Sequence, residues 1–113
     1  MIISLHETFH ALWTLRGHSE LATYEVQIYI EGPERGMMSD VAPILEEIKM
    51  LENGYLSKII GKSSLEAVAL YIRDFVNRHL EKCDKIVKII LRENDHFSAI
   101  LNENAILSSP ASK

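Results

Sequence analysis

The first chemically suggestive pattern in the chain is His6-Glu7-Thr8-Phe9-His10, which has the spacing of a zinc-peptidase motif. On a helix, the two histidines share one face and can bind a single zinc ion, with the glutamate as general base. On a strand they lie about 13 Å apart, at ~3.3 Å per residue, whereas both must reach the ion within ~2.1 Å. The longer form of the motif fails at Trp13 and Arg16. A zinc metallopeptidase is therefore an alternative that requires a helical first segment.

The hydrophobic pattern predicts which strands position such residues. Alternation over Tyr24–Ile30 is typical of a half-buried strand. The branched residues of Asp84–Leu91 and the segment His96–Leu101 indicate two more strands. The pattern of Ile2–Leu15 fits a strand or a helix. Its aromatic and branched residues favour a strand paired with Tyr24–Ile30.

Two amphipathic helices are predicted between the strand pairs. The first follows a cap at Ser39 or Asp40 and ends at Asn53-Gly54, a common left-handed termination. The second starts near Ser63-Ser64, with Glu66 in its first turn. This order of elements predicts an α+β fold, a four-stranded antiparallel sheet with both helices on one face.

Composition limits the partners and the compartment. The 113 residues suffice for one domain, which we place at residues 1–107, and a small polar tail at 108–113 is expected to be disordered. A net charge of −4 gives no basic face for nucleic acid. No apolar run approaches the ~20 residues of a membrane helix, and the N-terminus does not resemble a signal peptide. The single cysteine, Cys83, excludes an internal disulfide, so we expect a cytoplasmic protein.

Three segments occur in the order of a known family's motifs: Gly36-Met37-Met38-Ser39-Asp40, Leu51-Glu52-Asn53-Gly54-Tyr55-Leu56 and Ser63-Ser64-Leu65-Glu66. Together they resemble the 6-pyruvoyl-tetrahydropterin synthase and 6-carboxy-tetrahydropterin synthase family, which reads G-M-V-x-D-F, L-D-H-x-Y-L-N and P-T-x-E-N. The resemblance implies the tunnelling fold, in which several sheets assemble into an oligomeric barrel with active sites at subunit interfaces.

The zinc site of that family looks lost. Its members carry F-x-A-A-H on the first strand and C-G-x-x-H-G-H-N-Y leading into the second, with three histidines holding zinc. Aligned without gaps, the chain keeps the framework residues Phe9, Ala11, Gly17 and Tyr24. The ligand positions become Trp13, Glu20 and Ala22, and the cysteine becomes Arg16. We therefore expect no zinc cofactor.

A shifted register leaves one alternative open. His10, His18 and Glu20 would then form a rearranged metal site, and the chain would be an active zinc-dependent lyase of the synthase type. Without that site, His6, His10 and His18 are ordinary polar residues of strands and loops.

The acid–base pair of the family is also replaced. The L-D-H aspartate and histidine become Glu52 and Asn53. Asn53 has no titratable proton, and a lone glutamate has an ordinary pKa near ~4.3, away from the neutral range that suits proton exchange. Cys83 is too far from Arg16 in the expected fold to replace the catalytic thiol. We expect no catalytic residue at these positions, with Asn53-Gly54 as a helix terminator.

The resemblance implies one conserved binding role, for Glu93 at the end of a strand. The family's glutamate there accepts two hydrogen bonds from the pterin ring, and such charge-assisted pairs are specific for a guanidine-like edge. Ser64 and Glu66 match the neighbouring P-T-x-E segment. The prediction is a 6-pyruvoyl-tetrahydropterin synthase-like protein without zinc-dependent lyase activity, with a pterin- or purine-binding pocket at subunit interfaces.

Assembly is predicted from sheet edges as well. Edge strands present unpaired N–H and C=O groups that invite pairing, and neither Tyr24–Ile30 nor Asp84–Leu91 contains a proline that would block it. We expect a homo-oligomer, a trimer or hexamer as the resemblance implies.

Overall fold

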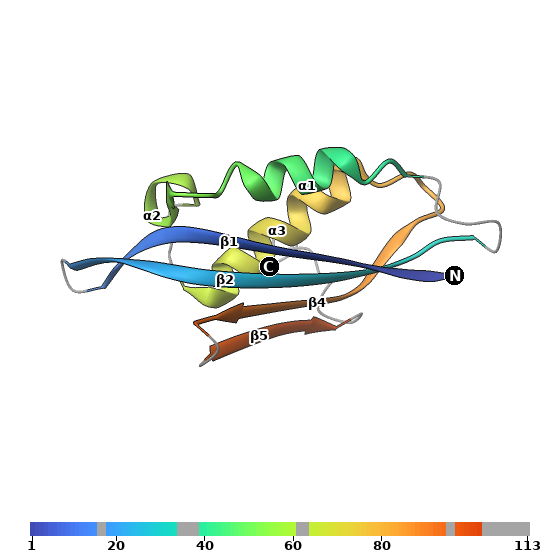
Figure 1. Cartoon of the computed structure of the whole chain (residues 1–113). Helices are drawn as coiled ribbons and strands as arrows, with labels where there is room; N and C mark the ends of the chain where they lie inside the picture. Colours follow the sequence, from blue (N-terminus) through green and yellow to red (C-terminus); the bar gives the residue numbers. More distant parts are fainter. Residues whose placement is uncertain (16–17, 34–38, 61–63, 95–96, 103–113) are drawn as a thin grey trace, which may run out of the picture.

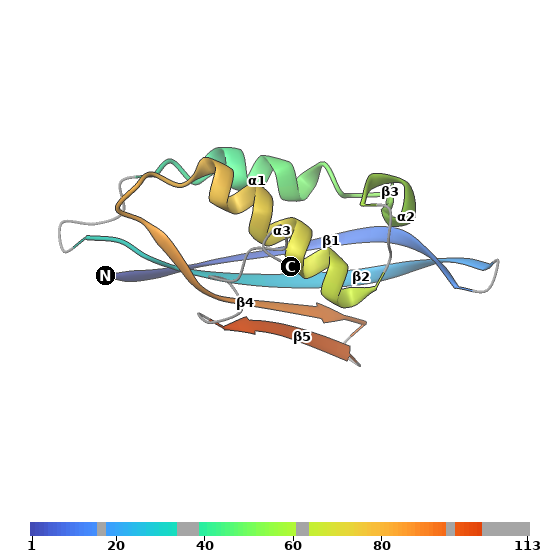
Figure 2. The ribbon, with the colours of Figure 1, turned by 180° about the vertical axis from the view of Figure 1, so that it is seen from behind.

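A computed structural model describes residues 1–15, 18–33, 39–60, 64–94 and 97–102. Within these residues, a five-stranded sheet has the order β3-β1-β2-β4-β5, and the helices lie on one of its faces (Figures 1 and 2). The elements along the chain are β1 (Ile2–Leu15), β2 (His18–Glu31), α1 (Ala42–Lys49), β3 (Gly54–Tyr55), α2 (Leu56–Ile59), α3 (Leu65–His79), β4 (Lys85–Glu93) and β5 (Phe97–Asn102). Among them, no helix is long and apolar enough to cross a membrane.

The four predicted strands and two predicted helices are confirmed, but the strand β3 and the one-turn helix α2 were not predicted. β3 pairs in parallel with β1 through Ala11↔Gly54 and Leu12↔Tyr55. Gly54 packs closely against Leu51 and Ile59. A Cβ atom at this position would lie 2.6 Å from Ile59 Cδ1 and 3.0 Å from the Leu51 carbonyl oxygen. A two-residue strand has no periodicity for sequence analysis to detect.

The ambiguous first segment is a strand. β1 pairs with β2 in antiparallel register from Ile2↔Glu31 to Leu15↔His18. His6 and His10 therefore lie on an extended chain, where they cannot share one zinc ion. The zinc metallopeptidase alternative is wrong because its helix is absent.

The core lies between the sheet and the helices. Alternate residues of β2 are buried and face α1 and α3, so the strand's hydrophobic alternation has its predicted consequence. Fully burying one such side chain contributes roughly 1.5–3 kcal/mol. The buried set includes Tyr24, Val26, Ile28, Ile30, Ile44, Ile48, Val68, Ile72, Phe75 and Val76.

α3 begins where it was expected, whereas α1 ends at Lys49, before the predicted end at Asn53-Gly54. α3 begins at the predicted cap, since Ser64 Oγ accepts a hydrogen bond from the Ala67 N–H at 3.2 Å. α1 has Val41 as its N-cap residue, while Asp40 Oδ1 accepts from the Ala42 N–H at 3.0 Å. Ser39 instead donates to Asp84 through both its N–H and its hydroxyl.

The predicted edge strands are not edges. β2 lies between β1 and β4, and β4 lies between β2 and β5, so the segments Tyr24–Ile30 and Asp84–Leu91 are interior. The edges of the described sheet are β5 on one side and β1 with its short partner β3 on the other. A bulge in β4 at Val87, between the pairs Tyr29↔Lys88 and Ile30↔Ile86, increases the local twist.

Candidate functional site

Four residues form a row across the sheet, on the face that the helices cover. Phe9 is opposite Tyr24, Tyr24 is opposite Glu93, and Glu93 is opposite Phe97. Directly opposed residues of antiparallel strands point to the same face, with their Cβ atoms ~4.5–5.5 Å apart. We call Phe9, Tyr24, Glu93 and Phe97 the Glu93 row. It runs from the fully buried Phe9 to Phe97, whose side chain is 68% exposed at the edge of the sheet.

Tyr24 is the buried polar member of the row. Its ring stacks on Phe9, with centroids 5.1 Å apart and planes 12° apart. Its hydroxyl is buried and has no hydrogen-bond partner among the described residues. Burial, with a further contribution from the charge of Glu93, raises the pKa of Tyr24 well above its usual range. Unsatisfied buried hydroxyls are rare and costly, so this one marks an unusual place in the fold.

Glu93 is the carboxylate of the row, and it is half-buried. Partial burial raises the pKa of its carboxyl above the ordinary value, because the charged form loses hydration. The turn after it is fixed by Asn94, whose backbone is left-handed with φ 51°. The Asn94 N–H donates to the Thr23 carbonyl, and Asn94 Oδ1 accepts from the Thr23 N–H, both at 2.8 Å. A partly dehydrated carboxylate held in this way gains strongly from accepting charge-assisted hydrogen bonds.

The first turn of α3 lies beside the end of β4 in both views (Figures 1 and 2). The helix therefore brings Ser64 and Glu66 to the same end of the sheet as Glu93, although they are far apart in the sequence. Both residues are exposed. The Ser64 hydroxyl already accepts the capping bond of α3. A ligand contact by Ser64 or Glu66 stays a prediction.

Glu52 and Asn53 bind one residue of β1. Glu52 Oε2 accepts from the His10 N–H at 3.0 Å, and Oε1 lies 2.8 Å from His10 Nδ1. The Asn53 N–H donates to the His10 carbonyl at 2.6 Å. The His10 side-chain bond, then its backbone bond, lower the pKa of the Glu52 carboxyl. Asn53 has φ 59°, which confirms the predicted left-handed conformation.

The pairing of His10 with Glu52 was not predicted. The two residues are 42 positions apart, and neither periodicity nor a motif relates them. Together with Asn53, the contact extends the β1–β3 pairing and fastens the α1–β3 turn to the sheet edge. The Glu52 carboxylate acts here as an acceptor for one histidine, half exposed to solvent.

One residue at the expected zinc positions, Ala22, cannot bind a zinc ion. Trp13 pairs with Glu20 and Ala11 pairs with Ala22, so the register brings positions 13, 20 and 22 together as the family requires. Ala22, however, is buried and has no donor atom, and Glu20 is exposed. Arg16 and the side chains of Trp13 and His18 lie outside the described part of the chain.

The rearranged metal site gains no support from the described geometry. His10 lies between Phe9 and Ala11, both fully buried on the helix-covered face, so its side chain points to the opposite face. Among the described residues, no group of three or more histidine, cysteine, aspartate or glutamate side chains is close enough to hold a metal ion.

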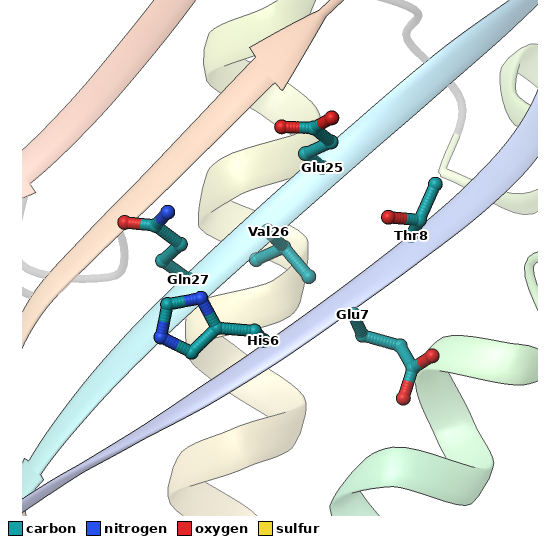
Figure 3. A pocket seen from close by; sticks show the side chains of 6 residues that line it. All are labelled: His6, Glu7, Thr8, Glu25, Val26 and Gln27. Carbon is teal, nitrogen blue, oxygen red and sulfur yellow. The ribbon is translucent and has the colours of Figure 1, made fainter.

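Two surface depressions lie elsewhere, and neither contains Glu93. The first, of about 290 Å³, is lined by polar residues of β1 and β2 and by Val26, and Figure 3 shows the His6 ring beside the Gln27 amide. The second, of about 350 Å³, is lined by residues of the α1, α2 and α3 region, including Glu47, Met50 and Tyr71. His79 Nε2 and Arg78 contact Glu47 at its rim, at 3.0 and 3.6 Å.

Comparison with known proteins supports the fold. No protein-family model matches the sequence, and no curated protein matches it at a significant level. Among solved structures, the chain is similar to 6-pyruvoyl tetrahydropterin synthase from Caenorhabditis elegans, with a TM-score of 0.63 and 16% sequence identity. The similarity covers 90% of this chain and 94% of that chain. The chain therefore has the α+β fold of 6-pyruvoyl tetrahydropterin synthase.

Proposed function

We propose that this chain is a 6-pyruvoyl-tetrahydropterin synthase-like protein that binds a pterin- or purine-like ring through Glu93 and lacks zinc-dependent lyase activity. The observation that carries the proposal is the half-buried Glu93 carboxylate at the end of β4, beside the first turn of α3, in a chain with this fold. Its carboxyl is partly buried, and this burial raises its pKa.

The binding chemistry follows from the carboxylate. Two oxygens accept from an N–H and an adjacent amino group of the ring, and each bond to a charged acceptor is worth roughly 1.5–3 kcal/mol. The raised pKa adds a condition, because only the ionised carboxylate accepts both bonds. We expect the lyase activity to be lost, since Asn53 carries no titratable proton and the Glu52 carboxylate is engaged with His10.

The assembly belongs to the proposal. We propose a homo-oligomer, a trimer or hexamer, in which neighbouring copies complete the wall of the ring site beyond the exposed Phe97. Open edges at β5 and β1 favour such pairing. Light scattering at micromolar concentration tests this step, and a monomeric mass contradicts it. The exposed free Cys83 is consistent with the reducing cytoplasm in which we place the protein.

Calorimetric titration with pterin, guanosine and adenosine tests the ring site. We expect pterin and guanosine to bind, and Glu93→Gln to weaken both by at least about tenfold, since ~1.4 kcal/mol is a factor of ten. Glu25→Gln is the matched control, because Glu25 lies in the neighbouring strand and lines the separate depression that includes His6. The proposal fails if no ring binds the wild type, or if Glu93→Gln binds as tightly as Glu25→Gln.

A further inference from the structure

Phe97 is a largely exposed aromatic side chain at the edge of the described sheet. It is the first residue of β5, and 68% of its surface is exposed, more than for the other exposed apolar residue of that strand, Ile100, at 56%. A single exposed apolar side chain is ordinary on a protein surface, so the role of Phe97 depends on what lies next to it.

The register places this ring next to the carboxylate of the proposed site. Phe97 is directly opposite Glu93, and the two side chains point to the same face of the sheet. Ala99 and Leu101, which lie two and four residues farther along β5, occupy that same face and pack with the core. Phe97 is therefore the member of that face that the α3 layer leaves open to solvent.

We infer that Phe97 is the stacking surface for the flat ring that Glu93 holds. The inference rests on the proposed function and names its ligand class more closely. The ligand is a fused heteroaromatic ring with an N–H and an amino group on one edge. That edge bonds to the Glu93 carboxylate, and the ring face lies on Phe97.

The geometry supports both contacts at once. Opposed side chains start ~4.5–5.5 Å apart, and stacked aromatic rings have centroids ~4.5–7 Å apart. A ligand ring bonded by its edge to Glu93 thus lies within stacking distance of the Phe97 ring. Stacking does not read the ring's edge, so Phe97 adds affinity for flat rings while Glu93 selects the donor edge.

The test compares two probes that share the donor edge and differ in the ring. Pterin has both, whereas the guanidinium ion has the donors alone. We expect Phe97→Ala to weaken pterin binding about tenfold, as stacking on one aromatic side chain does. Guanidinium binding, followed by nuclear magnetic resonance titration, should weaken less, because the small ion covers less of the Phe97 ring. Phe97→Tyr keeps a ring and should keep pterin affinity. Ile100→Ala is the control, because Ile100 is exposed on the same strand and alternates to the other face.

The outcomes separate this inference from the proposed function. If pterin binds, Glu93→Gln weakens it and Phe97→Ala does not, the stacking role is wrong and the ring site remains. If no ring binds the wild type, both fail. Stacking is wrong if Phe97→Ala weakens guanidinium binding as much as pterin binding, which would indicate a structural role. It is also wrong if Phe97→Ala changes the mass measured by light scattering while pterin affinity is kept, which would indicate an interface role.

Discussion

Tyr24 and Glu93 are directly opposed on β2 and β4, yet the buried Tyr24 hydroxyl makes no hydrogen bond to the Glu93 carboxylate or to any other described group. The charge of Glu93 instead adds to the effect of burial and raises the pKa of Tyr24. Two polar groups are thus kept side by side at the end of the sheet without satisfying each other. Such arrangements cost stability, and perturbed groups of this kind concentrate at functional sites.

Replacing Tyr24 by phenylalanine should stabilise the unliganded protein. The substitution keeps the ring that stacks on Phe9 and removes a buried hydroxyl whose lost hydration costs about 1–3 kcal/mol. Urea unfolding of Tyr24→Phe should therefore show a free energy of unfolding higher by about that amount. Tyr29→Phe is the control, since the Tyr29 hydroxyl has a partner in Gln27 at 3.2 Å. A Tyr24→Phe protein less stable than wild type would show that the hydroxyl has a bonding partner in solution.

The pH dependence of stability should reveal Glu93. Its folded-state pKa is raised above the ordinary 4.5 by burial, so the folded state binds the proton more tightly than the unfolded state does. The associated stability is fully present below that ordinary value and is lost as the pH rises through the folded-state pKa.

A neutral side chain at position 93 avoids this loss. Glu93→Gln should be more stable than wild type at neutral pH and nearly equal to it at about pH 4, where the wild-type carboxyl is protonated. Urea unfolding at the two pH values measures the difference. An equal difference at both values would mean that the carboxyl ionises as freely as in the unfolded chain.

Glu52 should show the opposite sign. Hydrogen bonds from the His10 side chain and backbone lower its pKa below 4.5, so its contribution is present above that value and is lost as the pH falls through the folded-state pKa. Glu52→Gln should lower the thermal midpoint by a few degrees at most, because the carboxylate is exposed. The decrease should be larger at neutral than at acid pH. Glu46→Gln, at an exposed position of α1, is the control.

Periodic features of the fold were predictable from the sequence, and solitary ones were not. β2 alternates buried and partly buried residues from Ala22 to Ile30, and α3 carries a buried stripe behind a serine cap, so both follow from the pattern. β3 has two residues and exists because Glu52, Asn53 and Gly54 bond to the edge of β1. Nothing local to those residues indicates that edge.

The residues of the candidate site also differ in how far the sequence could predict their roles. Glu93 was identified through a family resemblance. The position of Phe97 could have been predicted as well, since three residues separate it from Glu93 between two predicted strands and the two residues pair. The unbonded hydroxyl of Tyr24 could not have been predicted. The sequence identifies Tyr24 only as a buried strand residue, whereas the hydrogen bonding of its hydroxyl depends on the groups that surround it in the fold.

The last prediction concerns zinc. Protein purified without a histidine tag should contain no stoichiometric zinc, because Ala22 offers no donor atom at a required position and His10 points to the sheet face opposite Ala22. Added zinc should not raise the thermal midpoint and a chelator should not lower it, since only an ion bound to the folded state stabilises it. His18→Ala tests the rearranged site and His6→Ala reports adventitious binding. Stoichiometric zinc that is lost in His18→Ala and kept in His6→Ala would contradict the prediction and restore the synthase-type lyase.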